Sequence, residues 1–242
     1  MRVDGQPGWV LHGRPYRETS LLVECFTRDH GRLGLVARGV RRDKPRFPRA
    51  LLQPLVPLEL GWAGHGELGT LVAIDAAGQP LVPDGEARLC ALYINELVLR
   101  LTPRLDALPE LYAAYVDTLQ RLVASRSHAW TLRRFERDLL GETGYGVAAD
   151  VEADSGEPLA PDGEYSYVPE HGVIAWNGKP GTLCLRGSAL LALADDVEPD
   201  ARDLATLKRL MRALISHQLG GAALRSWGLV GTSRPTDAEP QR

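Results

Sequence analysis

The chain of 242 residues has room for two domains, and its 44% hydrophobic and 24% charged residues are ordinary for a protein with a packed core. These values exclude wholesale disorder, collagen and coiled coil, and no apolar run reaches the roughly 18 residues that cross a bilayer. The formal charge is -3, but residues 1–50 hold eleven Lys and Arg against five Asp and Glu, whereas the rest of the chain holds 17 against 26. A basic N-terminal part followed by an acidic remainder indicates that residues 1–50 bind a polyanion.

The first 80 or so residues have the pattern of a small β domain. Five segments rich in valine, leucine and aromatic residues are separated by glycine, proline or charged breaks. They are Gly8–Arg14, Thr19–Arg28, Arg32–Val40, Leu51–Trp62 and Glu67–Ala76. The intervals leave no room for crossover helices, so we predict an antiparallel barrel, and the OB-fold is the leading candidate of this size.

Side chains in the third segment alternate between two faces. Leu33, Leu35 and Ala37 share one face, while Arg32, Val36, Arg38 and Val40 share the other. We expect the first face to lie in the core and the second in solvent.

Beyond Ala76 the hydrophobic period becomes that of helices. The segment Glu86–Leu101 is apolar almost all round and predicts a buried helix, and apolar residues at spacings of three and four predict a second helix over Leu108–Val123. A third helix is expected over Trp130–Leu140, ended by Gly141 or Gly144. A long helix is expected over Leu204–Ile215, capped by Gly220–Gly221.

This order of elements predicts an α+β protein of two domains. An antiparallel OB-fold barrel is expected at 1–80, a helical domain at 81–230 and a flexible tail at 231–242. The helical domain carries a small acidic insertion at about 145–185. In the insertion, Tyr165–Val168 and Val173–Trp176 are expected to pair as a β-hairpin across Pro169–Gly172.

The three cysteines and the first residues indicate a cytoplasmic protein. Cys25, Cys90 and Cys184 lie far apart and form no CxxC pair, which argues against a disulfide framework and a cysteine-rich zinc site. Cys25 and Cys90 stand in apolar runs, where small core residues are usual. The opening MRVDGQPGW has no apolar signal-peptide stretch. We therefore expect a cytoplasmic location, associated with the nucleoid if the chain binds DNA.

No enzyme motif stands in the context that its chemistry needs. The segment Gly64–Gly69 fits GxGxxG, but a strand-like TLVAIDA follows it, so we predict a hairpin turn rather than a dinucleotide site. Pro180 follows the Gly178–Lys179 pair, so no Walker loop is expected. The six histidines show no HxH or HxxxH spacing. We expect no catalytic residues, no metal and no cofactor. An enzyme of unrecognised type stays a hypothesis beside the nucleic-acid-binding ones given below, and a screen for bound metal or nucleotide tests it.

A dense basic stretch follows the third predicted strand. Residues 38–49 read RGVRRDKPRFPR, with six positive side chains against Asp43 alone, and Pro45 and Pro48 keep the stretch out of a helix. In a five-stranded barrel this loop lies beside the face with which OB-folds bind oligonucleotides. Neighbouring arginines of the first turn and third strand join the same rim. The predicted DNA-binding residues are Arg14, Arg17, Arg32, Arg38, Arg41, Arg42, Lys44, Arg46 and Arg49.

Arginines on phosphates give affinity without sequence reading, and the affinity falls as salt rises. Tyr16 and Phe47 are candidates for stacking on bases, whereas Trp9 is more typical of a core residue. Two alternatives stay open: a solvated loop whose charges serve solubility, and an RNA-binding OB-fold module, because the same charges suit either nucleic acid.

A second basic feature lies on the third predicted helix. Arg133, Arg134 and Arg137 stand next to Leu132 and Phe135. A groove with an apolar floor and an arginine rim suits an acidic peptide with an aromatic end. An ordinary amphipathic helix with its arginines in water fits the sequence equally well.

Several segments, in order, resemble the RecO family of DNA repair proteins. They are the opening GWVLHGRPYRETSLLVECFTRDHGRLGLVARGVRR, then LQPLVPLEL, LYINEL at Leu92–Leu97, LRRFERDLLGETGYG at Leu132–Gly146, and the closing LISHQLGGAALRSWGL. The similarity runs from about Gly8 to Leu229, so it covers nearly the whole chain.

The resemblance implies a function that composition does not give. RecO-like proteins have an N-terminal OB-fold and a C-terminal helical domain, bind single- and double-stranded DNA without sequence preference, and anneal complementary strands without ATP. With RecR they help RecA displace the single-stranded DNA-binding protein at gaps. They also dock the acidic C-terminal tail of that single-stranded DNA-binding protein on the helical domain. On the matching LRRFE motif, Arg133 would contact the tail, with Arg134 as a second candidate.

One departure from the family pattern concerns zinc. Many relatives carry four cysteines that form a zinc ribbon just after the GYG motif, and residues 151–176 contain none. We therefore expect no zinc site and a hairpin held by packing alone, as in zinc-free relatives with a similar SGEP-containing insertion. The ending LGGAALRSW differs from the family's usual basic ending, which leaves any role for Arg225 open.

Overall fold

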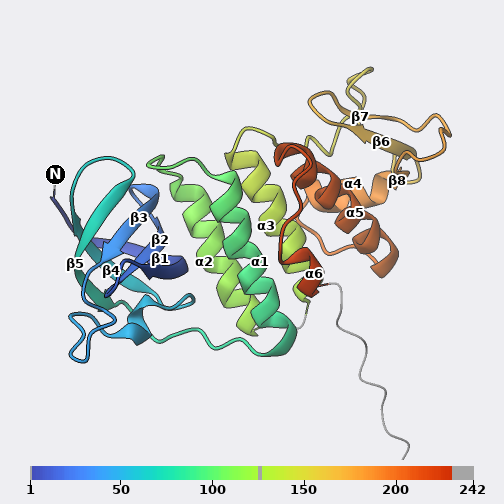
Figure 1. The fold of residues 1–242 in the computed structure, drawn as a ribbon. Helices are drawn as coiled ribbons and strands as arrows, with labels where there is room; N and C mark the ends of the chain where they lie inside the picture. The colour runs from blue at the N-terminus through green and yellow to red at the C-terminus, as the bar shows by residue number, and fades with distance from the viewer. Residues whose placement is uncertain (1, 125–126, 231–242) are drawn as a thin grey trace, which may run out of the picture.

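The computed structural model describes residues 2–124 and 127–230, which form an elongated molecule (Figure 1). A β-barrel lies at one end, three long helices lie in the middle, and a small sheet with further helices lies at the other end. The predicted tail at 231–242 lies outside the described residues. Within the two described ranges, no helix is both long and apolar enough to cross a membrane.

The barrel has five strands, as predicted. They are β1 (Arg2–Tyr16), β2 (Ser20–Thr27), β3 (Gly31–Ala37), β4 (Leu58–Ala63) and β5 (Leu68–Ala76). The strands close in the order β1-β2-β3-β5-β4, and every pair is antiparallel except β3 with β5, which is parallel. Alternate side chains such as Val10, Val23 and Leu35 fill the interior. The OB-like barrel is confirmed.

The fourth predicted strand, Leu51–Trp62, was too long. Its first half forms the 3-10 helix η1 (Arg49–Leu52) and a turn, and only β4 pairs in the sheet. Pro54 and Pro57 explain the difference, because proline lacks the N–H that a central strand needs. The apolar residues of this half, Leu52, Leu55 and Val56, are buried as loop residues instead.

The expected solvent face of β3 is also largely wrong. Val36 and Val40 are 8% and 0% exposed, and Arg32 is partly buried, so only Arg38 of that face reaches solvent. The helical domain and the loop after β3 cover the outside of this strand. The alternation of side chains along the sequence predicted the strand itself, but it did not reveal that other parts of the chain pack on its second face.

The three central helices agree with the prediction. They are α1 (Gly85–Leu101), α2 (Pro109–Ala124) and α3 (His128–Glu142), which is followed by Gly144 at a φ of +86°. Their shared core continues into the barrel through Trp9 and Phe26, whose rings lie 6.0 and 5.7 Å from the ring of Tyr115. The barrel therefore rests on α1 and α2 through apolar packing rather than through a linker alone.

The acidic insertion contains the predicted hairpin and a third strand. The strands β6 (Glu164–Val168) and β7 (Gly172–Ala175) pair antiparallel, and β8 (Leu185–Arg186) adds to the other edge of β6. Three helices follow, α4 (Gly187–Ala194), α5 (Ala201–Gln218) and α6 (Trp227–Val230). The predicted long helix is α5, while α6 was missed. Tyr165 and Val173 pack with Leu190 and Leu207 in the core of this region.

Candidate nucleic-acid interface

The basic loop at 38–49 is fixed to the barrel at several points. Gly39 turns the chain at a φ of +72°, and the N–H of Arg41 donates to the carbonyl of Thr19 at 2.9 Å. Val40 and Phe47 are 0% and 7% exposed in the barrel core. The loop is thus held against the β1–β2 turn with its charged side chains outward. The exposed ones are Arg38, Arg41, Arg42, Lys44, Arg46 and Arg49.

A groove of about 490 Å³ lies between this loop, the β1–β2 turn and the start of β5. We call it the arginine groove; it is lined by Tyr16, Arg17, Thr19, Ser20, Val36, Arg38, Gly39, Arg42, Leu68, Gly69 and Thr70. Arg17, which has a φ of +53°, lies with its guanidinium carbon 5.3 Å from the ring centre of Tyr16. Leu68 is 48% exposed. The groove therefore combines three guanidinium groups with an aromatic ring and an apolar side chain.

The positive charges of the arginine groove are unpaired among the residues that the structure describes. Within the described part of the chain, no carboxylate forms an ion pair with Arg17, Arg38 or Arg42. Such groups raise the local concentration of polyanions and exchange small counterions for phosphates. The groove can hold a phosphate backbone next to an unstacked base.

Arg32 does not join this groove. Its side chain is 12% exposed, and its Nε and Nη2 atoms donate to the carbonyl of Thr102 at 3.2 and 2.7 Å. Nη1 lies 3.5 Å from Oε2 of Glu24, and the other oxygen of that carboxylate, Oε1, accepts a hydrogen bond from Arg104 at 2.6 Å. Burial, with a contribution from Arg104, lowers the pKa of Arg32. Arg32 therefore connects β3 to the segment after α1, and we leave it out of the proposed DNA contacts.

Arg14, Arg46 and Arg49 lie outside the lining of the groove. Arg14 is exposed near the end of β1, opposite Leu22 of β2. The guanidinium of Arg46 lies 5.1 Å from the ring centre of Phe47, and Nε of Arg49 donates to the carbonyl of Val40 at 3.0 Å. These three stay predicted DNA contacts outside the arginine groove.

Of the three aromatic residues considered, only Tyr16 is placed to meet a base. Trp9 is 4% exposed and belongs to the core, as expected. Phe47 is 7% exposed, so the structure removes it as a stacking candidate. Tyr16 is partly exposed in the arginine groove.

The motifs set aside as non-catalytic have structural positions. The turn between β4 and β5 contains Gly64–Gly66, so the predicted hairpin turn is confirmed. Burial raises the pKa of the Cys25 thiol far above its usual value and that of Cys90 to about 11. Both thiols are buried core groups, as predicted. Across residues 2–124 and 127–230, no three His, Cys, Asp or Glu side chains gather so that they could hold a metal ion.

A smaller groove lies between α1, α3, α5 and α6, and we call it the peptide groove. It is lined by Glu86, Cys90, Tyr93, Ala129, Leu132, Arg133, Lys208, Arg212 and Trp227. Its floor is apolar and aromatic, and its basic groups come from two helices. Lys208 and Arg212 stand four positions apart on α5, a spacing that places both on one helix face. Their proximity to Arg133 of α3 could not be predicted from the sequence, because it depends on how the two helices pack.

Only one of the three arginines predicted for a peptide lines this groove. Arg133 is 3% exposed, and its guanidinium donates to the Glu136 carboxylate at 2.6 and 2.5 Å. Arg134 and Arg137 instead form ion pairs with Asp196, at 2.5 and 3.1 Å, in the loop after α4. These two therefore do not line the peptide groove: Arg134 points about 100° around the helix from Arg133, and Arg137, one turn further along, also donates to the carbonyl of Leu193.

Comparisons with known proteins agree along nearly the whole chain. The family model "Recombination protein O N terminal" matches residues 1–79, and "Recombination protein O C terminal" matches residues 82–228. A "DNA repair protein RecO" of Stenotrophomonas maltophilia (strain K279a) is 44% identical over 241 residues, 97% of this chain and 99% of its own. Proteins of the same name from Nitrosococcus oceani and Azoarcus sp. (strain BH72) are 45% and 44% identical, covering 95% and 93% of this chain and 94% of their own lengths.

Proposed function

The chain belongs to the RecO family of DNA repair proteins, and from this premise we propose that it is a recombination mediator that binds DNA in the arginine groove. It binds single- and double-stranded DNA without sequence preference and anneals complementary strands without ATP. The observation that carries the proposal is the meeting of Arg17, Arg38 and Arg42 around Tyr16, with no carboxylate of the described residues paired to them.

Annealing needs no covalent chemistry on this proposal. Guanidinium groups on phosphates lower the repulsion between two strands that approach each other. Tyr16 and Leu68 offer an apolar surface to an unpaired base. Base pairing then supplies the free energy, so the protein acts as a binding surface rather than as an enzyme.

A salt titration tests the DNA assignment. We expect the variant with Arg38, Arg41 and Arg42 replaced by alanine to bind single-stranded DNA more weakly. The plot of log affinity against log salt should also become less steep by about 2, because each lost phosphate contact contributes about 0.7 to the steepness. The matched control replaces three exposed arginines of α1 and α5, Arg100, Arg202 and Arg209, by alanine. If both triple variants change the slope equally, overall charge rather than the groove is responsible.

A second candidate function is RNA binding by the same barrel. Among the described residues that line the arginine groove, none forms a built site for the 2′-hydroxyl that distinguishes ribose from deoxyribose. The charges therefore favour neither polymer. Competition between DNA and RNA oligonucleotides of matched sequence separates the two. A strong preference for RNA would replace the DNA proposal.

We also propose that the peptide groove takes the acidic C-terminal tail of the single-stranded DNA-binding protein. Arg133, Lys208 and Arg212 suit carboxylates, and the floor at Leu132 and Trp227 suits an aromatic end. Replacing Lys208 and Arg212 by glutamine should weaken binding of an acidic peptide with a terminal aromatic residue about tenfold. Arg209→Gln on the same helix is the control, and DNA binding should persist in every variant.

With RecR, this pair of sites would help RecA replace the single-stranded DNA-binding protein on DNA, in the cytoplasm at the nucleoid. One groove recognises the protein tail while the other holds the exposed strand. RecA filament assembly on covered DNA, with RecR present, should therefore fall when either groove is altered. A variant that loses both binding activities but keeps normal RecA assembly would contradict this role.

A further inference from the structure

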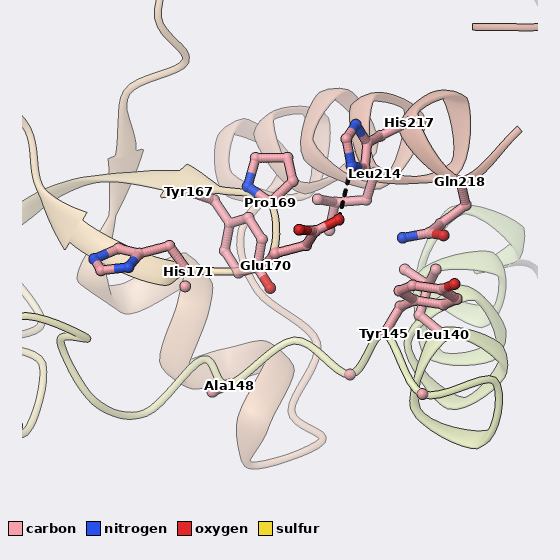
Figure 2. Close-up of a pocket in the computed structure, with 13 residues that line it drawn as sticks. Leu140, Tyr145, Ala148, Tyr167, Pro169, Glu170, His171, Leu214, His217 and Gln218 are labelled. Atoms are coloured by element: carbon pink, nitrogen blue, oxygen red, sulfur yellow. Dashed lines mark ion pairs between the residues drawn. The ribbon is translucent and has the colours of Figure 1, made fainter. Parts of the chain in front are cut away.

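A cavity of about 380 Å³ lies at the other end of the molecule from the arginine groove. It is enclosed by the end of α3, the following loop, the tip of the β6–β7 hairpin and the end of α5 (Figure 2). The proposed DNA and peptide sites use none of its side chains. Its volume lies in the range of ordinary ligand pockets.

A carboxylate and two tyrosine rings dominate this cavity. In Figure 2, the carboxylate of Glu170 points between the ring of Tyr167 on one side and that of Tyr145 on the other. The side chain of Glu170 is 78% exposed, with its oxygen 3.7 Å from Nε2 of His217, and Tyr145 is 48% exposed. The negative group and one of the rings are therefore open to a ligand.

The chain segment that forms most of the cavity is acidic, and the two histidines of the lining, His171 and His217, lie beside the carboxylates of Asp154 and Glu170. Between Asp138 and Gly178 the sequence contains nine carboxylates and neither lysine nor arginine. The carboxylates are Asp138, Glu142, Asp150, Glu152, Asp154, Glu157, Asp162, Glu164 and Glu170. α3 ends at Glu142 and α5 at Gln218, so the negative ends of two helix dipoles also lie near the cavity. Nucleic acid is disfavoured at this end of the molecule.

We propose that this cavity binds an arginine or lysine side chain carried by a basic segment of a partner protein. Such a side chain places its cation over the tyrosine rings and donates charge-assisted hydrogen bonds to Glu170. A protein segment, rather than a small cation, suits the site because the same stretch of chain carries eight further carboxylates outside the lining, most of them exposed, which suit further basic residues of the partner segment.

The test uses the full chain and a fluorescent ten-residue peptide of alternating arginine and serine. We expect the peptide to bind at low salt and a version with neutral citrulline in place of arginine to bind at least about tenfold more weakly. Glu170→Gln should weaken arginine-peptide binding about tenfold, and Tyr145→Ala about threefold. Fluorescence anisotropy measures each affinity.

Two further variants make the result decisive. Glu157→Gln removes an exposed carboxylate of the same acidic segment that does not line the cavity, and should change the affinity less than twofold. Glu170 has a φ of +65°, which glycine adopts without strain, so Glu170→Gly should keep the fold while weakening binding as Glu170→Gln does.

Three results would overturn the proposal. Equal losses for Glu157→Gln and Glu170→Gln would mean diffuse attraction rather than a pocket. Full peptide affinity in Glu170→Gly would exclude the carboxylate. A doubled mass in light scattering that Glu170→Gln abolishes would make a second copy of this chain the occupant. DNA affinity should be unchanged in the Glu170 variants, so failure here is distinct from failure of the DNA proposal.

Discussion

Arg133 and Glu136 form an ion pair that is almost completely hidden in the protein. Their side chains are 4% and 0% exposed, and the hydroxyl of Tyr93 donates to the same carboxylate at 2.6 Å. Removing two charges from water is costly, and only their mutual attraction and hydrogen bonds offset that cost. The pair has no net charge and is therefore a structural element of the peptide groove, whose remaining basic groups are Lys208 and Arg212.

Glu136→Gln should lower the free energy of unfolding by about 3 kcal/mol, because it leaves the Arg133 guanidinium buried without its counter-charge. The control Asp117→Asn breaks the ion pair with Arg121, whose side chains are about half exposed, and should cost less than about 1 kcal/mol. Urea unfolding followed by circular dichroism measures both. Small, equal losses would contradict the argument from burial.

At this scale the sequence predicts residue types better than their contacts. It indicated a basic loop, and six of its side chains are exposed. It did not reveal that Arg32 is bound to Thr102, because that partner lies 70 positions away. It also did not separate Arg133 from Arg134, which are neighbours in the chain but face different elements.

Among the secondary-structure elements, α6 and the turn before it are held by one side chain of α1. The Glu96 carboxylate accepts hydrogen bonds from the N–H of Arg225 at 2.9 Å, and from the N–H and hydroxyl of Ser226 at 2.9 and 2.6 Å. Leu224 is 3% exposed in the core next to this contact, and Trp227 lines the peptide groove. Glu96 therefore fixes one wall of that groove.

This contact should make stability depend on pH in the acidic range. Burial raises the pKa of Glu96, but the hydrogen bonds from Ser226 and Arg225 outweigh it and leave the pKa below its usual value of 4.5. The unfolded chain then binds the proton more readily, so the contribution to stability is present above pH 4.5 and is lost as the pH falls through the lower, folded value.

Glu96→Gln should therefore flatten the pH dependence of the unfolding free energy below pH 4.5, measured by urea titration at several pH values. Glu59→Gln, an exposed glutamate of β4, serves as the control and should leave the dependence as it is. An unchanged pH profile in Glu96→Gln would show that the carboxylate does not hold α6.

Element length and periodicity explain which elements could be predicted. Long segments with a clear apolar period, such as α2 and α5, were found within a few residues of their ends. The four residues of α6 and the two of β8 carry no period, and they form because distant groups hold them. The fourth predicted strand began too early, before the prolines at 54 and 57, because the apolar residues there belong to a buried loop instead.

On the scale of the whole molecule, the barrel and the helices share one core. The side chain of Asn95 on α1 donates to the carbonyl of Leu11 at 3.2 Å and accepts from the hydroxyl of Tyr115 at 2.7 Å. The change of hydrophobic period after Ala76 predicted an OB-fold followed by helices, but not this packing. The division at 1–80 and 81–230 stays a prediction, and the shared core indicates that the two parts depend on each other for stability.

Gly31 provides a direct test of whether the barrel is packed in a fixed position against the helices. It has a φ of +62°, and a Cβ atom there would lie 1.8 Å from the carbonyl oxygen of Asp106, between α1 and α2. Gly5 has a φ of +64° but no heavy atom within 4 Å of its Cβ position. Alanine at either site carries the left-handed backbone cost of about 1–2 kcal/mol, and only Gly31→Ala adds a clash with backbone.

Gly31→Ala should therefore reduce the free energy of unfolding by at least about 2 kcal/mol more than Gly5→Ala, since the clash must displace the α1–α2 connection or open the shared core. Urea unfolding of both variants measures the difference. Equal losses at the two glycines would mean that the barrel can shift on the helices at little cost, and the close approach would then not fix their arrangement.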